Sequence, residues 1–253
     1  MDPSEMWGTG DYKAVADRIA SAGETVVERA GIEPGMDVLD VACGTGNATV
    51  PAAKLAARVT GLDFAPELLK IAREYGADSM VEVDWIEGDA QDLPFEDDSF
   101  DRVISCFGQM FAPDHKRTAD EMRRVCRPDG RIAIACWTPE GKIGGMFQRI
   151  GSISPPPPEG FHPPTLWGTE DHVRKLLGDD VAFERHQVEW NAESPETYAE
   201  FMENSFGPLS SAREQLGGVV HETYLAWIHE VNEADDGTMR FSGEYLVSVA
   251  PPG

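Results

Sequence analysis

The stretch Val38-Leu39-Asp40-Val41-Ala42-Cys43-Gly44-Thr45-Gly46-Asn47 places a glycine-rich turn directly between a short apolar strand and a helix. Glycine suits such a turn because it adopts positive φ angles and lets the backbone approach a ligand without a Cβ atom in the way. The helix that follows presents free backbone N–H groups in its first turn. The segment therefore predicts a strand, a turn and a helix that together hold a small ligand.

Strands and helices alternate along the chain around this turn. Apolar residues at helical spacing predict helices, and short apolar runs bounded by turn residues predict strands. We expect helices over 11–30, 48–57, 66–75, 114–126, 194–206 and 210–231, and strands over 37–41, 58–62, 81–86, 100–107, 131–137, 181–190 and 239–249. This alternation predicts an α/β protein with a parallel sheet that is covered by helices on both faces.

The composition limits the partners. The 253 residues include 45 Asp and Glu but only 21 Lys and Arg, which gives a formal net charge of -24. Nucleic acids and anionic membranes need clustered basic residues, so we expect neither as a partner. The chain has no apolar run of about 18 residues and no basic, apolar start, so we expect a cytoplasmic protein. The acidity fits adaptation to high salt or a GC-rich genome, and it does not decide between them.

The four cysteines carry little information on chemistry. They form no CxxC pair, and Cys106 and Cys136 stand in apolar runs. We therefore expect reduced, mostly buried thiols and no metal site.

Two kinds of ligand fit the glycine turn. Asp63 ends the second strand 17 residues after Gly46, where a carboxylate can accept the hydroxyls of a ribose. Both NAD and S-adenosylmethionine contain such a ribose. Thr49 stands where the dinucleotide-binding pattern has Gly or Ala, which argues against NAD. The segments Glu87–Phe95 and Asp98–Asp101, around the third and fourth strands, discriminate between these two cofactors.

Five segments in this order resemble the class I S-adenosylmethionine-dependent methyltransferases, in the branch that includes the ubiquinone/menaquinone C-methyltransferases and many small-molecule enzymes. The matching segments, within residues 35–137, are Val38–Gly46, Gly61–Phe64, Gly88–Phe95, Phe100–Ser105 and Arg124–Gly130. Ala42 departs from the Gly that many members carry. The resemblance implies a Rossmann-like three-layer sandwich with a mostly parallel seven-stranded sheet, an antiparallel last strand and a small cap on the acceptor side.

On this resemblance the chain is one methyltransferase domain, 1–253. Residues 1–34 form an N-terminal helical segment and 35–138 the cofactor-binding core. Residues 139–180 and 191–235 form the cap, and 181–190 and 239–250 the final strands. The first cap segment is rich in Pro, including the run Pro155–Pro158, and is expected to be a connection that passes over the core.

The resemblance also implies roles for residues that bind S-adenosylmethionine, with S-adenosylhomocysteine as the product. Asp40 holds the amino end of the methionine moiety, and the turn from Ala42 through Gly44 to Gly46 lines the methionine and sugar. Cys43, within that turn, is a small buried filler rather than a nucleophile. Asp63 clamps the ribose.

The remaining roles surround the adenine and the methyl group. Phe64 packs near adenine, Asp89 accepts from the adenine amino group and Ala90 shapes the adenine pocket. The residues nearest the reactive methyl are expected to be Ser105, Cys106, Phe107 and, from the N-terminal segment, Tyr12. An aromatic ring such as that of Tyr12 suits the sulfonium cation, whereas we interpret Trp7 as an ordinary anchor of the terminal segment.

The acceptor site has weaker signals. Aromatic and apolar residues favour a small, largely apolar or aromatic acceptor, with Met110, Phe147, Phe161 and Trp167 in its pocket. Methyl transfer needs a base only when the acceptor must lose a proton, and His162 and His115 are the candidates. Two other functions stay open from sequence: an NAD(P)-dependent oxidoreductase on a Rossmann-type sheet, and a non-catalytic cofactor-binding protein of the same fold. The acceptor atom and the oligomeric state stay undetermined.

Overall fold

The computed structural model describes residues 3–156 and 160–252, and in this part of the chain seven strands form one sheet. The strand order is β3-β2-β1-β4-β5-β7-β6. β7 runs antiparallel to β5 and β6, and the other pairs are parallel, as predicted. The strands are β1 Asp37–Val41, β2 Arg58–Asp63, β3 Asp84–Glu87, β4 Phe100–Cys106, β5 Cys126–Trp137, β6 Ala182–Ala192 and β7 Met239–Ala250.

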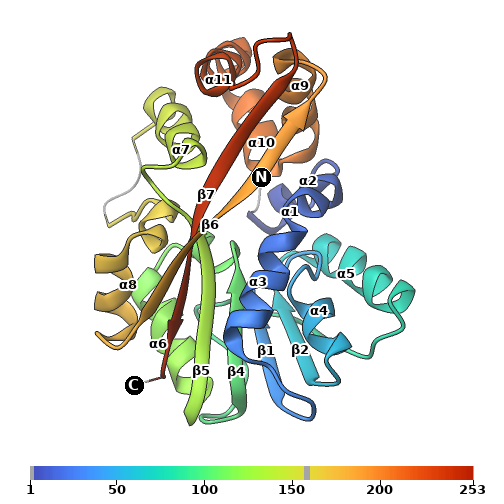
Figure 1. Cartoon of the computed structure of the whole chain (residues 1–253), viewed down its shortest axis with the longest axis vertical. Helices are drawn as coiled ribbons and strands as arrows, with labels where there is room; N and C mark the ends of the chain where they lie inside the picture. The colour runs from blue at the N-terminus through green and yellow to red at the C-terminus, as the bar shows by residue number, and fades with distance from the viewer. Residues whose placement is uncertain (1–2, 157–159, 253) are drawn as a thin grey trace.

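Helices cover both faces of this sheet (Figure 1). On one face α3 packs on β4 and β5, and α4 packs beside it on β2; on the other face α6 packs on β4 and β5, with α8 next to it. These helices are α3 Ala20–Ala30, α4 Thr49–Lys54, α6 His115–Val125 and α8 Glu170–Leu177, and α5 Pro66–Asp78 follows β2. This is the three-layer sandwich that the sequence predicts.

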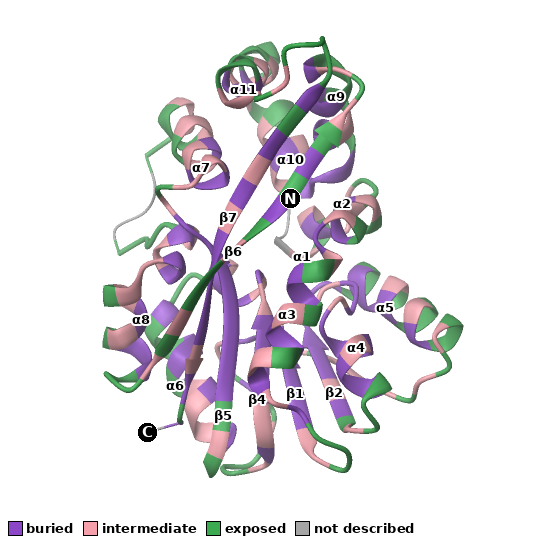
Figure 2. Cartoon of the chain, viewed as in Figure 1, coloured by how far each residue is buried: buried purple, intermediate pink, exposed green. Residues whose placement is uncertain are grey.

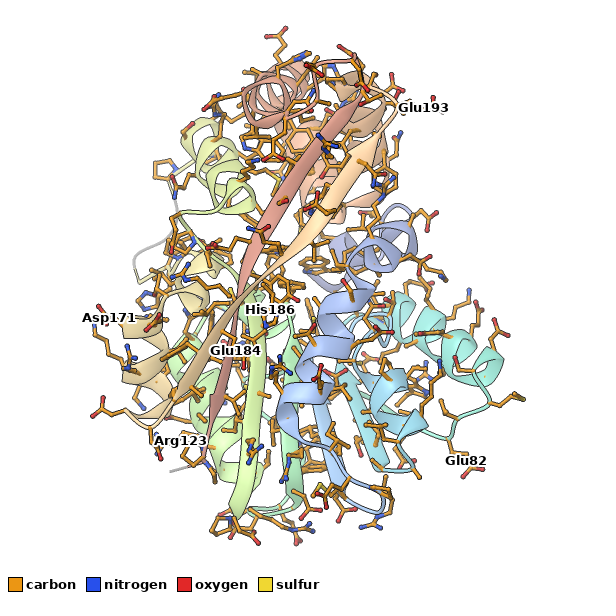
Figure 3. All side chains as sticks on the ribbon, viewed as in Figure 1. Glu82, Arg123, Asp171, Glu184, His186 and Glu193 are labelled. Carbon is orange, nitrogen blue, oxygen red and sulfur yellow. The ribbon has the colours of Figure 1, made fainter. Side chains whose placement is uncertain are left out.

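The burial of the strands follows from this covering (Figure 2). Central strands read as continuous apolar runs because helices exclude water from both faces; Val38 and Leu39 of β1 and Ile132 of β5 are fully buried. The edge strand β6 instead alternates between more exposed and more buried side chains. On β6, Glu184 accepts a hydrogen bond from Arg29 of α3 at 2.7 Å, and His186 lies beside Glu184 (Figure 3). Charged side chains on an edge strand discourage pairing with another chain.

Two predicted helices are interrupted. The helix expected over 11–30 divides at Ile19 into α2, Tyr12–Arg18, and α3, because Ile19 leaves the helical region at φ -107° and ψ 10°. The helix expected over 210–231 divides at Gly217 into α10, Gly207–Leu216, and α11, Gly218–Val231. Gly217 has φ 72°, which glycine adopts without strain. A further short helix, α1 Pro3–Trp7, precedes α2.

The predicted cap boundaries need correction. The segment 139–180 contains α7, Lys142–Ile153, before the run that begins at Pro155, and the 3-10 helix η2, Pro164–Gly168, after that run. Pro157 and Pro158 of the expected connection lie outside the described residues. α8 does not join the cap. It buries Val173, Leu176 and Leu177 and packs against α6, because these apolar residues recur at helical spacing on one face.

The cap is built on the far halves of β6 and β7. These two strands continue beyond the rest of the sheet into a group of helices formed by α7, α10, α11 and α9, Pro195–Ser205 (Figure 1). The centre of this group is aromatic: Phe241 of β7 lies between Trp190, Tyr198 and Trp227, with ring centroids 5.4–6.3 Å from its own. The antiparallel pair β6 and β7 therefore fixes the cap over the carboxyl ends of β4 and β5.

Candidate active site

The glycine turn after β1 has the backbone geometry that its sequence predicts. Gly44 and Gly46 have φ angles of 55° and 91°, and Ala42 has φ 52°. A Cβ atom on Gly44 would meet no atom within 4 Å, so this part of the turn faces open space. Ala42 adopts a conformation that costs an L-residue about 1 kcal/mol, which explains why Gly is the commoner residue at this position of the motif.

The loop after β4 lies directly against this turn. A Cβ atom on Gly108 would lie 2.1 Å from the carbonyl oxygen of Ala42, so only glycine fits. Phe107, just before it, also has a positive φ of 61°. The loops that follow β1 and β4 are therefore in close backbone contact at the base of a cavity.

Asp63 connects the end of β2 to the turn. Its Oδ2 accepts a hydrogen bond from the Gly44 N–H at 2.8 Å, and its Oδ1 accepts one from the Ala65 N–H at 2.9 Å. Burial raises the pKa of this carboxyl to about 6, although the backbone N–H groups act in the opposite direction. The side chain lines the cavity beside the turn.

Asp40, in β1, is the second buried acid. Its Oδ2 accepts a hydrogen bond from the Thr49 hydroxyl at 2.5 Å, and its Oδ1 has no partner among the described residues. Burial, together with the nearby Asp63 charge, raises its pKa to about 7. Because buried carboxylates need compensation, this pair of acids favours a ligand that carries positive charge and hydroxyl groups.

An inner cavity lies beside Asp63. Ala42, Cys43 and Gly44 of the turn, Asp63, Phe64, Cys106 and Phe107 line it from the sheet, whereas the predicted residues Asp40 and Gly46 do not border it because they pack inside the core. The N-terminal helices cover it with Tyr12, Ile19 and Trp7. Trp7 does anchor the segment, through edge contacts with Tyr12 and Phe111 at 5.5 and 4.7 Å, but it also faces the cavity.

Some residues that line the inner cavity were not predicted from the sequence. Thr45, Asn47, Ala16 and Leu68 also border the inner cavity. Thr45 and Asn47 stand next to the glycines of the motif, so the motif could have indicated them. Ala16 and Leu68 lie on helix faces whose sequence pattern is that of ordinary core residues.

A side cavity of about 550 Å³ adjoins the inner one, and Phe64 borders both. Asp89 and Ala90, from the loop after β3, line it together with Gly88 and Gln91. The Asp89 carboxylate accepts a hydrogen bond from the Gln91 N–H at 2.8 Å, which orders this loop. The structure therefore places Asp63, Phe64, Asp89 and Ala90 on the walls of these two adjoining cavities.

Three further predicted contacts lie elsewhere. The Ser105 hydroxyl donates to the Val41 carbonyl at 2.5 Å and accepts from the Gln109 N–H at 3.1 Å, so it joins β1 and β4 from within the core. Met110 and Trp167 are fully buried and border none of the cavities described. Met110 lies in the short 3-10 helix η1, Gln109–Phe111, and Trp167 lies in η2; both side chains are part of the apolar core.

A third cavity, which we call the acceptor chamber, opens from the inner cavity under the cap. Tyr12, Ile19, Phe107 and Phe111 border both. The other walls of the chamber come from α2, β5, α7, β6 and α9 and consist of Val15, Trp137, Ile143, Met146, Phe147, Trp190, Met202 and Phe206.

An apolar groove of about 460 Å³ continues from this chamber to the surface, past Phe147 and Phe161. These are the two residues for which the predicted pocket position matches a cavity.

The candidate bases do not border these cavities. His115 is buried, its Nδ1 lies 3.0 Å from Nε2 of His172, and its ring centroid is 5.4 Å from that of the exposed His162. Burial and the two neighbouring histidines lower the pKa of His115 to about 4. This cluster joins α6, α8 and the segment before η2, outside the chamber, so the geometry gives neither His115 nor His162 access to an acceptor there.

The cysteines and acids form no metal centre within residues 3–156 and 160–252, where no three His, Cys, Asp or Glu side chains are arranged to hold an ion. Cys43, Cys126 and Cys136 are buried free thiols, and Cys106 is half-buried at the inner cavity. Among the helices of this described part, none is long and apolar enough to cross a membrane.

Comparison with known proteins agrees with this geometry. A family model described as a methyltransferase domain matches residues 39–134. The crystal structure of a putative methyltransferase from Bacillus halodurans has the same fold, with a TM-score of 0.64 and 19% identity over 90% of this chain and 97% of that one.

Relatives in sequence define the protein further. A demethylmenaquinone methyltransferase of Staphylococcus aureus is 42% identical over 110 residues, 42% of this chain and 45% of that protein. The chain belongs to the class I S-adenosylmethionine-dependent methyltransferases, and it is an enzyme of that family. Within the family it is similar over most of its length to the uncharacterized protein Rv1405c of Mycobacterium tuberculosis, at 42% identity over 84% of this chain and 79% of that protein.

Proposed function

We propose that this enzyme transfers a methyl group from S-adenosylmethionine to a small, uncharged and largely apolar acceptor. The observation that carries the proposal is the junction of two different cavities at Tyr12 and Phe107. One cavity has the buried acid Asp63 and a glycine turn at its base, and the other has aromatic walls. A cationic cofactor fits the first and an apolar molecule fits the second.

The residues of the inner and side cavities fit the cofactor. Asp63 has lone pairs for the ribose hydroxyls, and the unpartnered oxygen of Asp40 suits the ammonium end of the methionine moiety. The open face of Gly44 leaves room for the sugar. Phe64 and Asp89 border the side cavity, where the adenine would lie.

When bound, S-adenosylmethionine supplies a methyl group that its sulfonium already activates. The enzyme then has to align the acceptor for in-line displacement and exclude water. Phe107 stacks on Trp137 with centroids 4.1 Å apart, which keeps the junction apolar. Burial and the nearby Cys106 raise the pKa of Tyr12 above its usual value, so its hydroxyl stays protonated and acts as a hydrogen-bond donor. This environment suits an acceptor that needs no base on the enzyme.

Calorimetry with S-adenosylmethionine and S-adenosylhomocysteine tests the cofactor site. We expect binding at micromolar level, and we expect Asp63→Ala to weaken it by about 2 kcal/mol, roughly 30-fold, because charge-assisted hydrogen bonds to the ribose are lost. Glu82→Ala is the matched control, since it removes an exposed acid near β3 (Figure 3). No heat with either ligand on folded protein would refute the assignment, and unchanged affinity in Asp63→Ala would refute the ribose contact.

Catalysis is tested separately from binding. The protein and S-adenosylmethionine are incubated with a panel of uncharged aromatic compounds, and products are screened by mass spectrometry for the gain of one methyl group. A protein that binds the cofactor yet methylates no member of a broad panel is the non-catalytic protein of the same fold, contrary to the proposal.

A further inference from the structure

The apolar groove that leads from the acceptor chamber to the surface is much larger than the chamber itself. The groove has a volume of about 460 Å³ and the chamber one of about 40 Å³. A single water needs roughly 10–15 Å³, so the chamber has room for a group of about three heavy atoms. The groove lies in the size range of sites that hold small organic ligands. A ring system therefore fits the groove, and only a narrow group fits the chamber.

One face of α7 forms a long wall of the groove. Phe147, Ile150, Gly151 and Ser154 line it and recur at helical spacing, so they lie along one stripe of the helix. The other walls come from the segment around η2 and from the start of α10, and their lining residues are Phe161, Pro163, Pro164, Thr165, Phe206, Pro208 and Leu209. Because aromatic rings gain energy from stacked or edge-on contact with other rings, these walls suit a flat apolar ligand.

The few polar side chains along the groove offer little to a polar ligand. The Gln148 amide donates to the Pro139 carbonyl at 3.1 Å, and the Ser154 hydroxyl donates to the Ile150 carbonyl at 2.9 Å. Thr165 is buried. No charged side chain is among the lining residues that the structure describes. A charged ligand would lose its hydration here without compensation, so the groove favours an uncharged occupant.

The groove is continuous with the junction where the methyl group is transferred. Phe147 and Phe206 border both the groove and the chamber, and Tyr12 and Phe107 border both the chamber and the inner cavity. At the outer end of the groove, Phe161 is 44% exposed. An exposed aromatic ring beside an apolar groove marks surface that a bound apolar ligand would cover. The three cavities therefore form one path from solvent to the cofactor.

We propose that the groove binds the body of the acceptor: an uncharged ring system lies along α7, and a narrow side arm that carries the methyl-accepting atom extends through the chamber to the cofactor. This deepens the proposed function and rests on it. The size and the aromatic walls of the groove favour a ring system, and its lack of charge excludes ionic acceptors. The small chamber restricts the reacting end to a narrow arm, so compounds whose accepting atom is part of the ring are excluded.

Filling the groove tests the site of the ring system. Gly151 lies on the groove face of α7, and a Cβ atom there would meet no atom within 4 Å, so Gly151→Leu adds an apolar side chain without a clash. The probe is N-phenyl-1-naphthylamine, an uncharged ring compound whose fluorescence rises in apolar surroundings. We expect the native protein loaded with S-adenosylhomocysteine to bind it at micromolar level, and Gly151→Leu to bind it about tenfold more weakly because apolar contacts are lost.

Gly218→Leu is the matched control. Gly218 begins α11, a Cβ atom there also meets nothing within 4 Å, and the residue borders none of the cavities described. This variant should bind the probe as the native protein does. Absence of probe binding, equal affinities of the native protein and Gly151→Leu, or an equal loss in Gly218→Leu would each overturn the proposal.

A pair of isomers tests the narrow arm on the native protein. The probes are 2-n-butylnaphthalene and 2-tert-butylnaphthalene, which have the same composition and differ in the width of the side arm. Their affinities are measured by displacement of N-phenyl-1-naphthylamine. We expect the n-butyl compound to bind about tenfold more tightly, because only its arm enters the chamber and is buried there. Equal affinities, or tighter binding of the tert-butyl compound, would overturn the restriction to a narrow arm.

Cofactor binding separates the two levels of inference. S-adenosylhomocysteine affinity is measured on the same samples, together with the thermal unfolding midpoint of each variant, and we expect both variants to keep the native affinity. Failure of the native protein to bind S-adenosylhomocysteine refutes the proposed function itself. Normal S-adenosylhomocysteine binding with a negative result in the probe experiments leaves the methyltransferase intact and overturns the groove. In the products of the acceptor screen, tandem mass spectrometry should locate the new methyl group on a side arm, and a methyl group on a ring atom would contradict the proposed acceptor class.

Discussion

The cofactor end and the acceptor chamber are adjacent but are built in different ways. The cofactor end uses short segments that follow successive strands, with glycines at positive φ and two buried acids. The acceptor chamber gathers side chains from residue 12 to residue 206, all but a few of them apolar. Backbone geometry and buried charge restrict which residues are possible, whereas an apolar wall accepts many. The first site is therefore specified locally and the second by packing.

Buried titratable groups at the cofactor end and in the histidine cluster between α6 and α8 respond to pH in opposite directions. Burial raises the pKa values of Asp40 and Asp63 at the cofactor end to about 7 and about 6. In the histidine cluster, which lies outside the acceptor chamber, burial lowers the pKa of His115 to about 4. Rising pH therefore introduces unfavourable charge at the cofactor end, and falling pH introduces it between α6 and α8.

The largest effect is expected where the two regions meet. In Gly108→Ala the new methyl group collides with the Ala42 carbonyl, so the loops after β1 and β4 must separate. We expect a loss of about 3 kcal/mol in unfolding free energy, measured by urea denaturation, with cofactor binding also weakened. Gly151→Ala is the control, because a Cβ atom there meets nothing within 4 Å. Equal stabilities of the two variants would contradict the close approach.

The next effect concerns the histidine cluster outside the acceptor chamber. The pKa of His115 is lower in the folded protein than the unfolded value of 6.5, so its contribution to stability is complete above pH 6.5 and is lost as the pH falls toward 4. Between pH 6.5 and 5 this loss is about 2 kcal/mol. In His115→Gln the stability curve should lack this component, while the acids at the cofactor end still titrate in both proteins. Parallel pH curves for the two proteins would show that His115 is not held neutral.

Cofactor binding should depend on pH in a way that acceptor binding does not. Asp63 must be ionised to accept both ribose hydroxyls, and its pKa in the free protein is about 6. S-adenosylmethionine affinity should therefore fall about tenfold from pH 7 to pH 5. The affinity for an uncharged aromatic compound identified as an acceptor should stay constant, because Tyr12 remains protonated throughout. Asp63→Asn should flatten the first profile, and a pH dependence shared by both ligands would remove the distinction between the sites.

The smallest effect is restricted to the cofactor end. Thr49→Val removes the hydroxyl that donates to Asp40, which leaves the ionised carboxylate without this partner. We expect a loss of about 1 kcal/mol in unfolding free energy at pH 8 and a smaller loss at pH 5, where Asp40 is protonated. Thr25→Val, which removes an exposed hydroxyl bond to Ser21, provides the comparison. A loss that grows toward low pH would contradict the assigned state of Asp40.

The sequence predicted the cofactor end better than the chamber for physical reasons. The glycine turn, Asp63 and the Asp89 loop stand at strand ends, and parallel strands bring those ends to one edge. Ser105 does not lie at the site because its hydroxyl donates a hydrogen bond to a backbone carbonyl. No sequence pattern distinguishes such a hydroxyl from one that binds a ligand. Met110 and Trp167 fail for a related reason, since an apolar side chain in the core and one in a pocket have the same sequence pattern.

The sequence by itself predicted the order of the strands and helices and the segments at the base of the inner cavity. The antiparallel last strand was predicted from the resemblance of the chain to the methyltransferase family. Only the tertiary structure decided where helices break at Ile19 and Gly217, that α8 leaves the cap for α6, and that Trp7 and Trp190 face cavities. The physical reason is range. Turn geometry and strand polarity act over a few residues, whereas the chamber depends on how the far halves of the β6–β7 pair pack against helices that are distant in the chain.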